Sequence, residues 1–158
     1  MVGKVLGNRY EILERLGGGG MAIVYKGRDT MLNRLVTIKV LRPEYTSDED
    51  FVRRFRREAR SVASLSHPNI VNIYDVGQES DVYYLVMEYI DGENLKTLIK
   101  REGPLPLEKA LQFAGQICDA LDHAHENNIV HRDVKPHNIL ITKTGRAKLC
   151  LLYTSRCV

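Results

Sequence analysis

Three polar side chains lie close together in the segment IVHRDVKPHNILI, which spans residues 129–141. They are Asp133, Lys135 and Asn138, and apolar runs flank them on both sides, so a polar loop is held between two buried anchors. A carboxylate, an ammonium group and an amide in one loop can orient or deprotonate a hydroxyl, neutralise a phosphate and hold a metal ion. A purely structural loop is the alternative, and the order and spacing of the three residues favour chemistry.

A run of four glycines, Gly17 to Gly20, lies in LGGGGMAIVYKG between two β-type segments. Glycines at such a place let the backbone approach a ligand closely and donate its N–H groups to phosphate oxygens. A dinucleotide-binding fold would need a helix directly after the turn, and the sequence indicates a strand there instead. Taken alone, the run also fits a flexible hairpin.

Lys39 lies among apolar residues in the β-type run VTIKV. In a strand that is buried on both faces a lysine is costly unless a carboxylate or phosphate meets it, whereas in an edge strand it could point to water. Glu58 lies on or beside the apolar stripe of a predicted helix and needs a partner as well. We therefore expect Lys39 and Glu58 to pair with each other.

Short β-type runs fill residues 10–89 and are interrupted by one helix, expected over residues 48–66 with Ser47 as its N-cap. Helical periodicity then takes over, with a short helix over residues 95–100 and a long one from Pro106 to about Glu126. A strand-rich lobe thus precedes a helical one. The apolar stripe expected for the long helix comprises Leu107, Leu111, Ala114, Ile117, Leu121 and Ala124.

The 158 residues are 44% apolar and 27% charged, which is typical of a soluble globular protein. The net charge of +3 is too small to indicate a class of binding partner. No run approaches the roughly 20 apolar residues of a membrane span, and the N-terminus lacks a signal-peptide core, so the segment is expected to be cytoplasmic. Five arginines in the helix over residues 48–66 indicate a solvated face, with a docking surface for a phosphorylated loop as the alternative. They are Arg53, Arg54, Arg56, Arg57 and Arg60.

Several motifs, in order, resemble the catalytic domain of the eukaryotic-type (Hanks-type) bacterial serine/threonine protein kinases, over residues 8–149. LGGGGMAIV resembles the glycine-rich loop, TIK the strand lysine motif, HPNIV the turn after the helix, LVMEYI the approach to the hinge, and HRDVKPHN the catalytic loop. The resemblance implies an α+β, protein-kinase-like bilobal fold. A complete antiparallel β N-lobe with one helix would occupy residues 1–89, and the hinge with the first part of the helical C-lobe residues 90–149.

The resemblance also implies roles for individual residues. Asp133 would accept or orient the substrate hydroxyl proton, Lys135 would stabilise the transferring phosphoryl group, and Asn138 would bind one Mg²⁺. Lys39 would hold the α- and β-phosphates of ATP, with Glu58 as its partner. The expected ATP-binding residues are Leu16, Gly17, Gly18, Gly19, Gly20, Ala22, Val24, Lys39, Glu88 and Ile90.

The last nine residues, CLLYTSRCV, depart from the family pattern. In the family, the strand that matches RAKL continues through one residue into an Asp-Phe-Gly triplet, whereas Leu151, Leu152 and Tyr153 stand at those positions, and no acidic residue follows Asp133. Because Mg²⁺ is normally held by one or two carboxylates with phosphate and water, Asn138 alone is expected to make a poor site. We interpret residues 150–158 as a tail foreign to the family after a truncation, with a genuine short protein as the alternative.

The first hypothesis is therefore an ATP-dependent protein serine/threonine kinase, present as an N-terminal fragment that is inactive as it stands. Its expected partners are Mg-ATP and a protein substrate, and no contact with nucleic acid or a membrane is expected in this segment. Bacterial relatives often carry a membrane span after the kinase domain, so the parent protein could be membrane-anchored. The alternative is a non-catalytic nucleotide-binding or partner-binding fragment. A third hypothesis is nucleic-acid binding through the arginine-rich helix. It predicts that the protein is retained on a polyanion column and that this retention falls steeply with salt concentration.

Overall fold

A computed structural model describes residues 1–151 of the chain. Leu152, Tyr153 and the rest of the predicted tail up to residue 158 lie outside the described residues. The chain divides into two compact units. The first comprises Met1–Ala63 and Ile73–Tyr89, and the second comprises Ser64–Asn72 and the residues from Ile90 onward.

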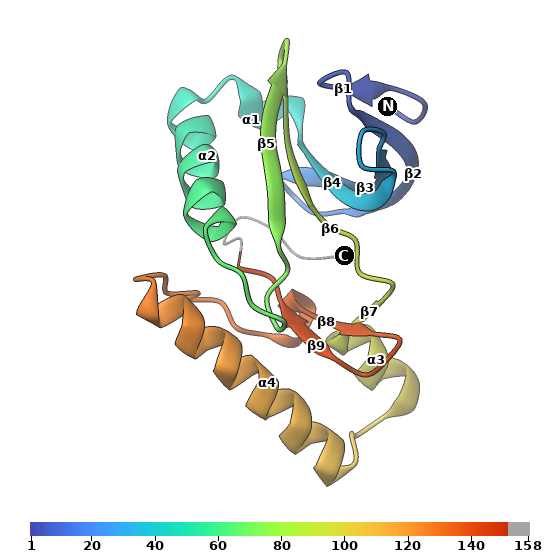
Figure 1. Cartoon of the computed structure of the whole chain (residues 1–158), viewed down its shortest axis with the longest axis vertical. Helices are drawn as coiled ribbons and strands as arrows, with labels where there is room; N and C mark the ends of the chain where they lie inside the picture. The colour runs from blue at the N-terminus through green and yellow to red at the C-terminus, as the bar shows by residue number, and fades with distance from the viewer. Residues whose placement is uncertain (152–158) are drawn as a thin grey trace. The chain divides into compact units, whose positions relative to one another are not determined.

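The first unit is built on an antiparallel sheet, which confirms the predicted strand-rich first lobe (Figure 1). Its strands lie in the order β1-β2-β3-β4-β6-β5, and each neighbouring pair is antiparallel. Their bounds are β1 Val5–Leu6, β2 Tyr10–Gly18, β3 Ala22–Asp29, β4 Arg34–Leu41, β5 Ile73–Glu79 and β6 Val82–Glu88.

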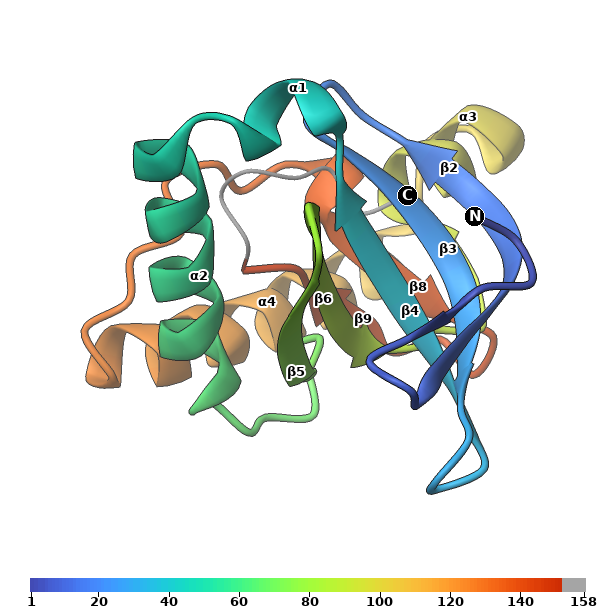
Figure 2. The same cartoon turned by 90° about the horizontal axis from the view of Figure 1, so that it is seen from above.

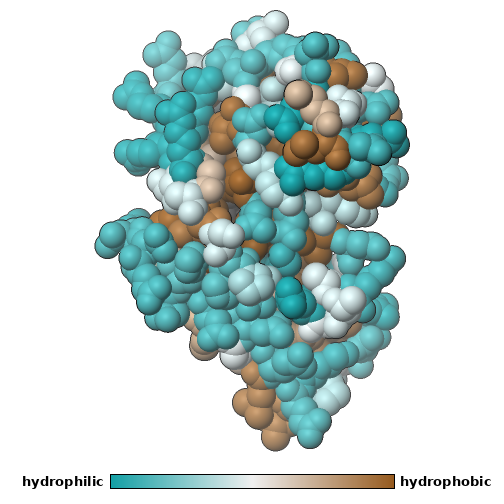
Figure 3. Space-filling model, viewed as in Figure 1, coloured by the Kyte–Doolittle hydropathy of each residue, from teal (hydrophilic) through white to brown (hydrophobic). Residues whose placement is uncertain are grey.

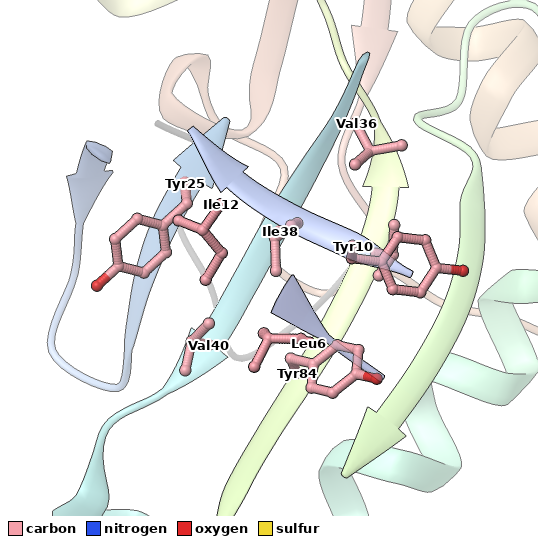
Figure 4. Packing of buried hydrophobic residues seen from close by; sticks show 9 residues of the cluster. Leu6, Tyr10, Ile12, Tyr25, Val36, Ile38, Val40 and Tyr84 are labelled. Atoms are coloured by element: carbon pink, nitrogen blue, oxygen red, sulfur yellow. The ribbon is translucent and has the colours of Figure 1, made fainter. Parts of the chain in front are cut away.

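Alternation along β4 decides which of its side chains enter the core of this unit. Val36, Ile38 and Val40 point into a buried cluster, and successive side chains of a strand point to opposite faces, so Lys39 lies on the other face of the sheet. The other members of the cluster come from β1, β2, β3 and β6, and most are labelled in Figure 4. They are Leu6, Tyr10, Ile12, Tyr25, Tyr84 and Val86.

Helix α2, Glu49–Ala63, lies against β5 (Figures 1 and 2) and ends before Ser66, the end expected from the sequence. The N-cap differs from the prediction, because the Asp48 Oδ1 atom accepts a hydrogen bond from Phe51 N at 3.0 Å. Asp48 therefore has the capping role that was assigned to Ser47. The buried residues of the helix are Val52, Phe55, Ala59 and Val62.

A short helix, α1 (Pro43–Thr46), precedes α2 and was not predicted. Four residues are too few to show helical periodicity, so only Pro43, which stands in the first turn, could have indicated it. The expectation of a single helix in the first lobe is therefore corrected to α1 and α2.

The second unit combines two longer helices with a small antiparallel sheet in the order β7-β8-β9. Asn94 caps α3, since its side chain accepts a hydrogen bond from Thr97 N at 2.8 Å, and α4 packs against β9. Among the helices of residues 1–151, none has both the length and the apolar character that a membrane span needs. The bounds are β7 Gly92–Asn94, α3 Leu95–Glu102, α4 Leu107–Glu126, a 3₁₀ turn Pro136–Asn138, β8 Ile139–Thr142 and β9 Ala147–Leu149.

The apolar stripe predicted for α4 is only partly correct. Ile117 and Ala124 are buried as expected, but Leu107 and Leu111 are 75% and 63% exposed. Ala114 is exposed as well, and Leu121 is half-buried. The buried face is instead completed by Phe113 and Ala120. The helix carries apolar residues on two adjoining faces, and the periodicity alone did not distinguish the face that packs within residues 1–151.

A buried carboxylate closes the turn between β3 and β4. Asp29 is fully buried and accepts hydrogen bonds from Arg9 Nε at 2.9 Å and Arg9 Nη2 at 2.7 Å, as well as from the backbone N–H groups of Met31 and Leu32. The Arg9 hydrogen bonds hold the pKa of the Asp29 carboxyl below its usual value, against the opposing effect of burial. Asp29 thus ties the start of β2 to the turn after β3.

We expect Asp29→Asn to lower the free energy of unfolding by about 2 kcal/mol at pH 7, because it removes the negative partner of Arg9. The folded-state pKa of Asp29 lies below its unfolded-state value, so the ionic contribution is complete above about pH 4 and is lost as the pH falls through the folded-state pKa. Urea unfolding of both proteins at pH 7 and at pH 3 measures the difference. Asp81→Asn, at an exposed turn, is the control; an equal loss in both variants would contradict the assignment.

Candidate active site

The four-glycine run forms the hairpin between β2 and β3. Gly19 N donates to Ala22 O at 3.0 Å, and Arg42 braces the turn through its backbone N–H on Met21 O and its Nε on Gly19 O. A Cβ atom at Gly18 would lie 3.2 Å from Ala22 O, tighter than most real contacts, whereas one at Gly19 would meet no described atom within 4 Å. The space beside Gly19 is therefore open within the described residues, although its N–H group is already bonded to Ala22 O.

Val24, Lys39 and Leu85 lie side by side on one face of the sheet. Val24 pairs with Lys39 in the register of β3 and β4, and Lys39 pairs with Leu85 in the register of β4 and β6. Directly opposite residues point to the same face, which here is the face away from the core cluster. The structure thus brings Val24, a predicted ATP-binding residue, next to the predicted phosphate lysine Lys39, within one unit.

The remaining predicted ATP residues of the first unit lie at the ends of its strands. Leu16 and Gly17 belong to β2, Ala22 begins β3, and Glu88 ends β6 opposite Val36. Ile90 belongs to the second unit.

The predicted ion pair between Lys39 and Glu58 is not formed among the described residues. Lys39 is 2% exposed, and burial lowers its pKa to about 7. Burial also raises the pKa of the Glu58 carboxyl, against the opposing charges of Arg57 and Arg54, and Glu58 Oε2 has no hydrogen-bond partner in residues 1–151. The charges that act on the Glu58 carboxylate are thus those of its helix neighbours, Arg57 and Arg54. Within residues 1–151, Glu58 Oε2 and the Lys39 ammonium group each lack a partner.

Asp133, Lys135 and Asn138 do converge, in the loop before β8. Lys135 Nζ lies 2.9 Å from Asp133 Oδ2, and Asn138 Nδ2 donates to the backbone oxygen of Asp133 at 2.9 Å. The hydrogen bond from Lys135 holds the pKa of the Asp133 carboxyl below its usual value, with partial burial opposing it. Asp133 is therefore an ionised carboxylate at neutral pH, and it remains partly accessible.

His131 fixes the backbone of this loop. Asp133 N donates to His131 Nδ1 at 3.0 Å, so Nδ1 carries no proton, and Nε2 is the nitrogen that donates to Cys150 O at 2.6 Å. Cys150 N in turn donates to Asn138 O at 2.9 Å. The residue directly after β9 is thereby tied to both ends of the loop that carries Asp133.

The segment Ser64–Asn72, which contains the HPNIV motif, supports the other side of β9. Leu149 N donates to Asn69 O at 2.7 Å, Val71 N donates to Leu149 O at 3.0 Å, and Asn69 Nδ2 donates to Ala147 O at 2.9 Å. No role was predicted for Asn69 or His131, although both lie in motifs of the sequence, HPNIV and HRD. Their signal was present, since a polar residue between apolar neighbours needs a buried partner.

Asn138 offers one oxygen to a metal ion. Its side chain is 4% exposed, and Oδ1 has no hydrogen-bond partner in residues 1–151, which is what a metal ligand awaiting its ion would show. Leu151, at the position expected for the metal-binding aspartate, is a buried apolar side chain that cannot coordinate metal. The described residues also contain no cluster of three or more metal-ligating side chains. The oxygen donors therefore fit only part of a Mg²⁺ site.

Comparison with known proteins identifies the family. The protein kinase domain family matches residues 10–152. Serine/threonine-protein kinase PrkC of Bacillus subtilis is 55% identical over 149 residues, which cover 94% of this chain and 23% of PrkC. Serine/threonine-protein kinase PknB of Mycobacterium tuberculosis is 45% identical over 148 residues, which cover 91% of this chain and 24% of PknB.

Solved structures agree with the sequence relatives. The crystal structure of the Mycobacterium tuberculosis PknI kinase domain superimposes with a TM-score of 0.85 at 30% identity, over 98% of this chain and 64% of that domain. The chain therefore belongs to the protein kinase family, and its curated relatives are bacterial serine/threonine kinases. It spans less than a quarter of the length of those relatives.

We expect Lys39→Met to raise the free energy of unfolding at pH 7.5 by on the order of 2 kcal/mol, because it removes a buried amine that has no partner among the described residues. The folded-state pKa of about 7 lies below the unfolded-state value of about 10.4, so the unfolded chain binds more protons between them. The stability of the unaltered protein should therefore rise between pH 7 and pH 10, and that of the variant should rise less.

Urea unfolding at several pH values tests this, with the exposed Lys4→Met as the matched control. If Lys39→Met instead destabilises the protein, the ammonium group has a carboxylate partner in solution, and Glu58 is the first residue to examine.

Proposed function

We propose that this chain is the nucleotide-binding and catalytic-loop part of an ATP-dependent protein serine/threonine kinase. The observation that carries the proposal is the convergence of Asp133, Lys135 and Asn138 on one loop whose backbone is fixed by His131. Family membership supports the use of ATP and a divalent metal. The transfer would run from the γ-phosphate of ATP to a serine or threonine hydroxyl of a protein.

Asp133 is suited to orient the attacking hydroxyl. Its carboxylate stays ionised at neutral pH and is about two-fifths exposed, so it can accept a hydrogen bond from a substrate hydroxyl. Lys135 carries the positive charge that would stabilise the transferring phosphoryl group. Its present contact with Asp133 keeps both side chains in one orientation, which lowers the cost of assembling the site.

The first unit would hold the nucleotide. The hairpin from Gly17 to Gly20 offers an accessible backbone to phosphate oxygens, and Val24 and Lys39 share one face of the sheet. A phosphate beside Lys39 would supply the anion that its buried ammonium group lacks, so binding would favour the charged form of the lysine.

The metal ion would supply charge neutralisation of the phosphates, and Asn138 Oδ1 would be its ligand from this chain. An amide oxygen alone is a weak Mg²⁺ site, and the apolar Leu151 leaves the expected carboxylate position empty of ligand atoms. We therefore propose that the 158-residue chain by itself does not transfer phosphate. The same observation supports a second candidate, a nucleotide-binding fragment without catalysis.

The first test is phosphate transfer from radiolabelled ATP to a generic protein substrate in the presence of Mg²⁺. We expect the chain to show no more incorporation than its Asp133→Ala variant. Incorporation that is abolished by Asp133→Ala would overturn the proposed inactivity and would show that the metal is held without a carboxylate at position 151.

The second test separates nucleotide binding from catalysis. ATP at millimolar concentration should raise the melting temperature of the chain by a few degrees, because a ligand that binds only the folded state stabilises it. The shift should be strongly reduced in Lys39→Met and retained in Lys4→Met, measured by differential scanning fluorimetry. Equal shifts in the two variants would remove Lys39 from the binding site, and no shift in any protein would exclude both candidate functions for this chain.

A further inference from the structure

Arg42 lies between β4 and α1 (Figure 2), and its side chain turns back to the glycine hairpin of the first unit. The surface over α2 is strongly hydrophilic in Figure 3, whereas Arg42 is half-buried. The Nε atom of Arg42 donates to Gly19 O at 3.1 Å, and its backbone N–H donates to Met21 O at 2.9 Å. One residue outside the hairpin therefore holds two carbonyl groups at its tip.

The hydrogen bond to Gly19 O also sets the direction of a neighbouring N–H group. A trans peptide unit is planar, and its C=O and N–H bonds point in opposite directions, so the unit between Gly19 and Gly20 turns as one body. With Gly19 O held by Arg42, the Gly20 N–H group points away from the Arg42 side chain. Gly20 is exposed, and its N–H group has no hydrogen-bond partner within residues 1–151, so it stays available to a ligand.

The free side of this peptide unit is the side of the sheet that carries Lys39. Arg42 has extended backbone angles, φ −70° and ψ 146°, so the alternation of β4 continues through it. Lys39 and Arg42 are three residues apart, and their side chains therefore leave the chain on opposite faces. An N–H group that points away from Arg42 thus points toward the face on which Lys39 lies.

The glycine run makes this contact matter for binding. Four consecutive glycines can adopt many backbone conformations, and each residue that becomes ordered on binding costs conformational entropy. Gly19 N also donates to Ala22 O at 3.0 Å, but that hydrogen bond lies within the hairpin and does not connect its tip to β4. The two Arg42 hydrogen bonds do connect them, so they order the tip before a ligand arrives.

We propose that Arg42 is a positioning residue of the nucleotide site, which holds the hairpin so that the Gly20 N–H group meets the phosphate chain of ATP. Arg42 does not itself touch the nucleotide, because it acts through the peptide unit between Gly19 and Gly20. This inference rests on the proposed nucleotide-binding function and extends it to a residue outside the glycine run. Loss of the Arg42 contact should weaken the binding of a nucleotide that has phosphates and leave the binding of the bare nucleoside unchanged.

Two variants at position 42 separate the hydrogen bond from the charge. In Arg42→Gln the side-chain amide nitrogen takes the place of Nε, at the same number of bonds from Cα, so glutamine can donate to Gly19 O without a positive charge. Arg42→Met has a side chain of similar length and no donor. The matched control is Arg15→Met, because the Arg15 guanidinium lies beside Gly18 but forms no hydrogen bond or ion pair within residues 1–151.

The test is the competition of ATP and of adenosine against a fluorescent ATP analogue in the presence of Mg²⁺, with the 158-residue chain and with each variant. We expect Arg42→Met to weaken ATP binding by about fivefold or more and to change adenosine binding by less than about twofold. Arg42→Gln and Arg15→Met should each change the affinity for either ligand by less than about twofold.

Amide hydrogen exchange of the ligand-free proteins measures the Arg42 contact itself. In Arg42→Met the peptides that cover residues 18–22 should exchange faster than in the unaltered chain, because the tip of the hairpin has lost a hydrogen bond to the residue after β4. Exchange in β5 and β6 should not change, which shows that the variant remains folded.

Three results would overturn the proposal. They are a loss of ATP affinity in Arg42→Gln as large as that in Arg42→Met, an equal loss of ATP and adenosine affinity in Arg42→Met, and unchanged exchange at residues 18–22 in Arg42→Met. If ATP does not displace the analogue from the unaltered chain, the proposed nucleotide-binding function itself fails. The exchange measurement needs no nucleotide, so it distinguishes that failure from the absence of an ordering effect of Arg42.

Discussion

The alternation of side chains along β4 is the constraint on which the first unit depends. Val36, Ile38 and Val40 must enter the core cluster, and the same alternation forces Lys39 into the opposite face, where it is 2% exposed. A one-residue slip of β4 would exchange the two sets, burying an ammonium group in the cluster and exposing three apolar side chains. The core therefore fixes the register of β4 that places Lys39 beside Val24. The packing of the core and the proposed phosphate contact of Lys39 both depend on this one register.

In the second unit the comparable constraint is a set of backbone hydrogen bonds around β9. The loop that carries Asp133 is held at His131 and Asn138 by the two polar groups of Cys150, and β9 itself is bonded to the backbone of Asn69 and Val71. The side chains of Asp133 and Lys135 are 42% and 38% exposed, whereas those of His131 and Asn138, which hold the loop, are buried. The hydrogen bond from Lys135 holds the pKa of the Asp133 carboxyl below its usual value, so this partly accessible carboxylate is ionised at neutral pH.

The sequence predicted local motifs well and long-range partners less well. The glycine hairpin, the strand-rich first lobe and the convergence of Asp133, Lys135 and Asn138 follow from residue types at short spacing, and the structure contains all three. The antiparallel arrangement of the first lobe was implied by the family resemblance. The pairing of Lys39 with Glu58 was inferred from two separate requirements for a partner, and the position of a helix relative to a strand is set by packing that no local pattern encodes. The stripe of α4 was wrong at Leu107 and Leu111 for the same reason, since the helix has two apolar faces and only the tertiary neighbours select one.

Two buried polar groups of the proposed ligand sites lack a partner in the part of the chain that the structure describes. Within residues 1–151, Lys39 lacks an anion, and Asn138 Oδ1 lacks a hydrogen-bond donor or a cation. A buried group without a partner costs stability, so its retention in an otherwise well-packed unit points to a ligand that completes it. The proposed nucleotide would supply an anion beside Lys39, and the proposed metal ion would supply a cation beside Asn138 Oδ1.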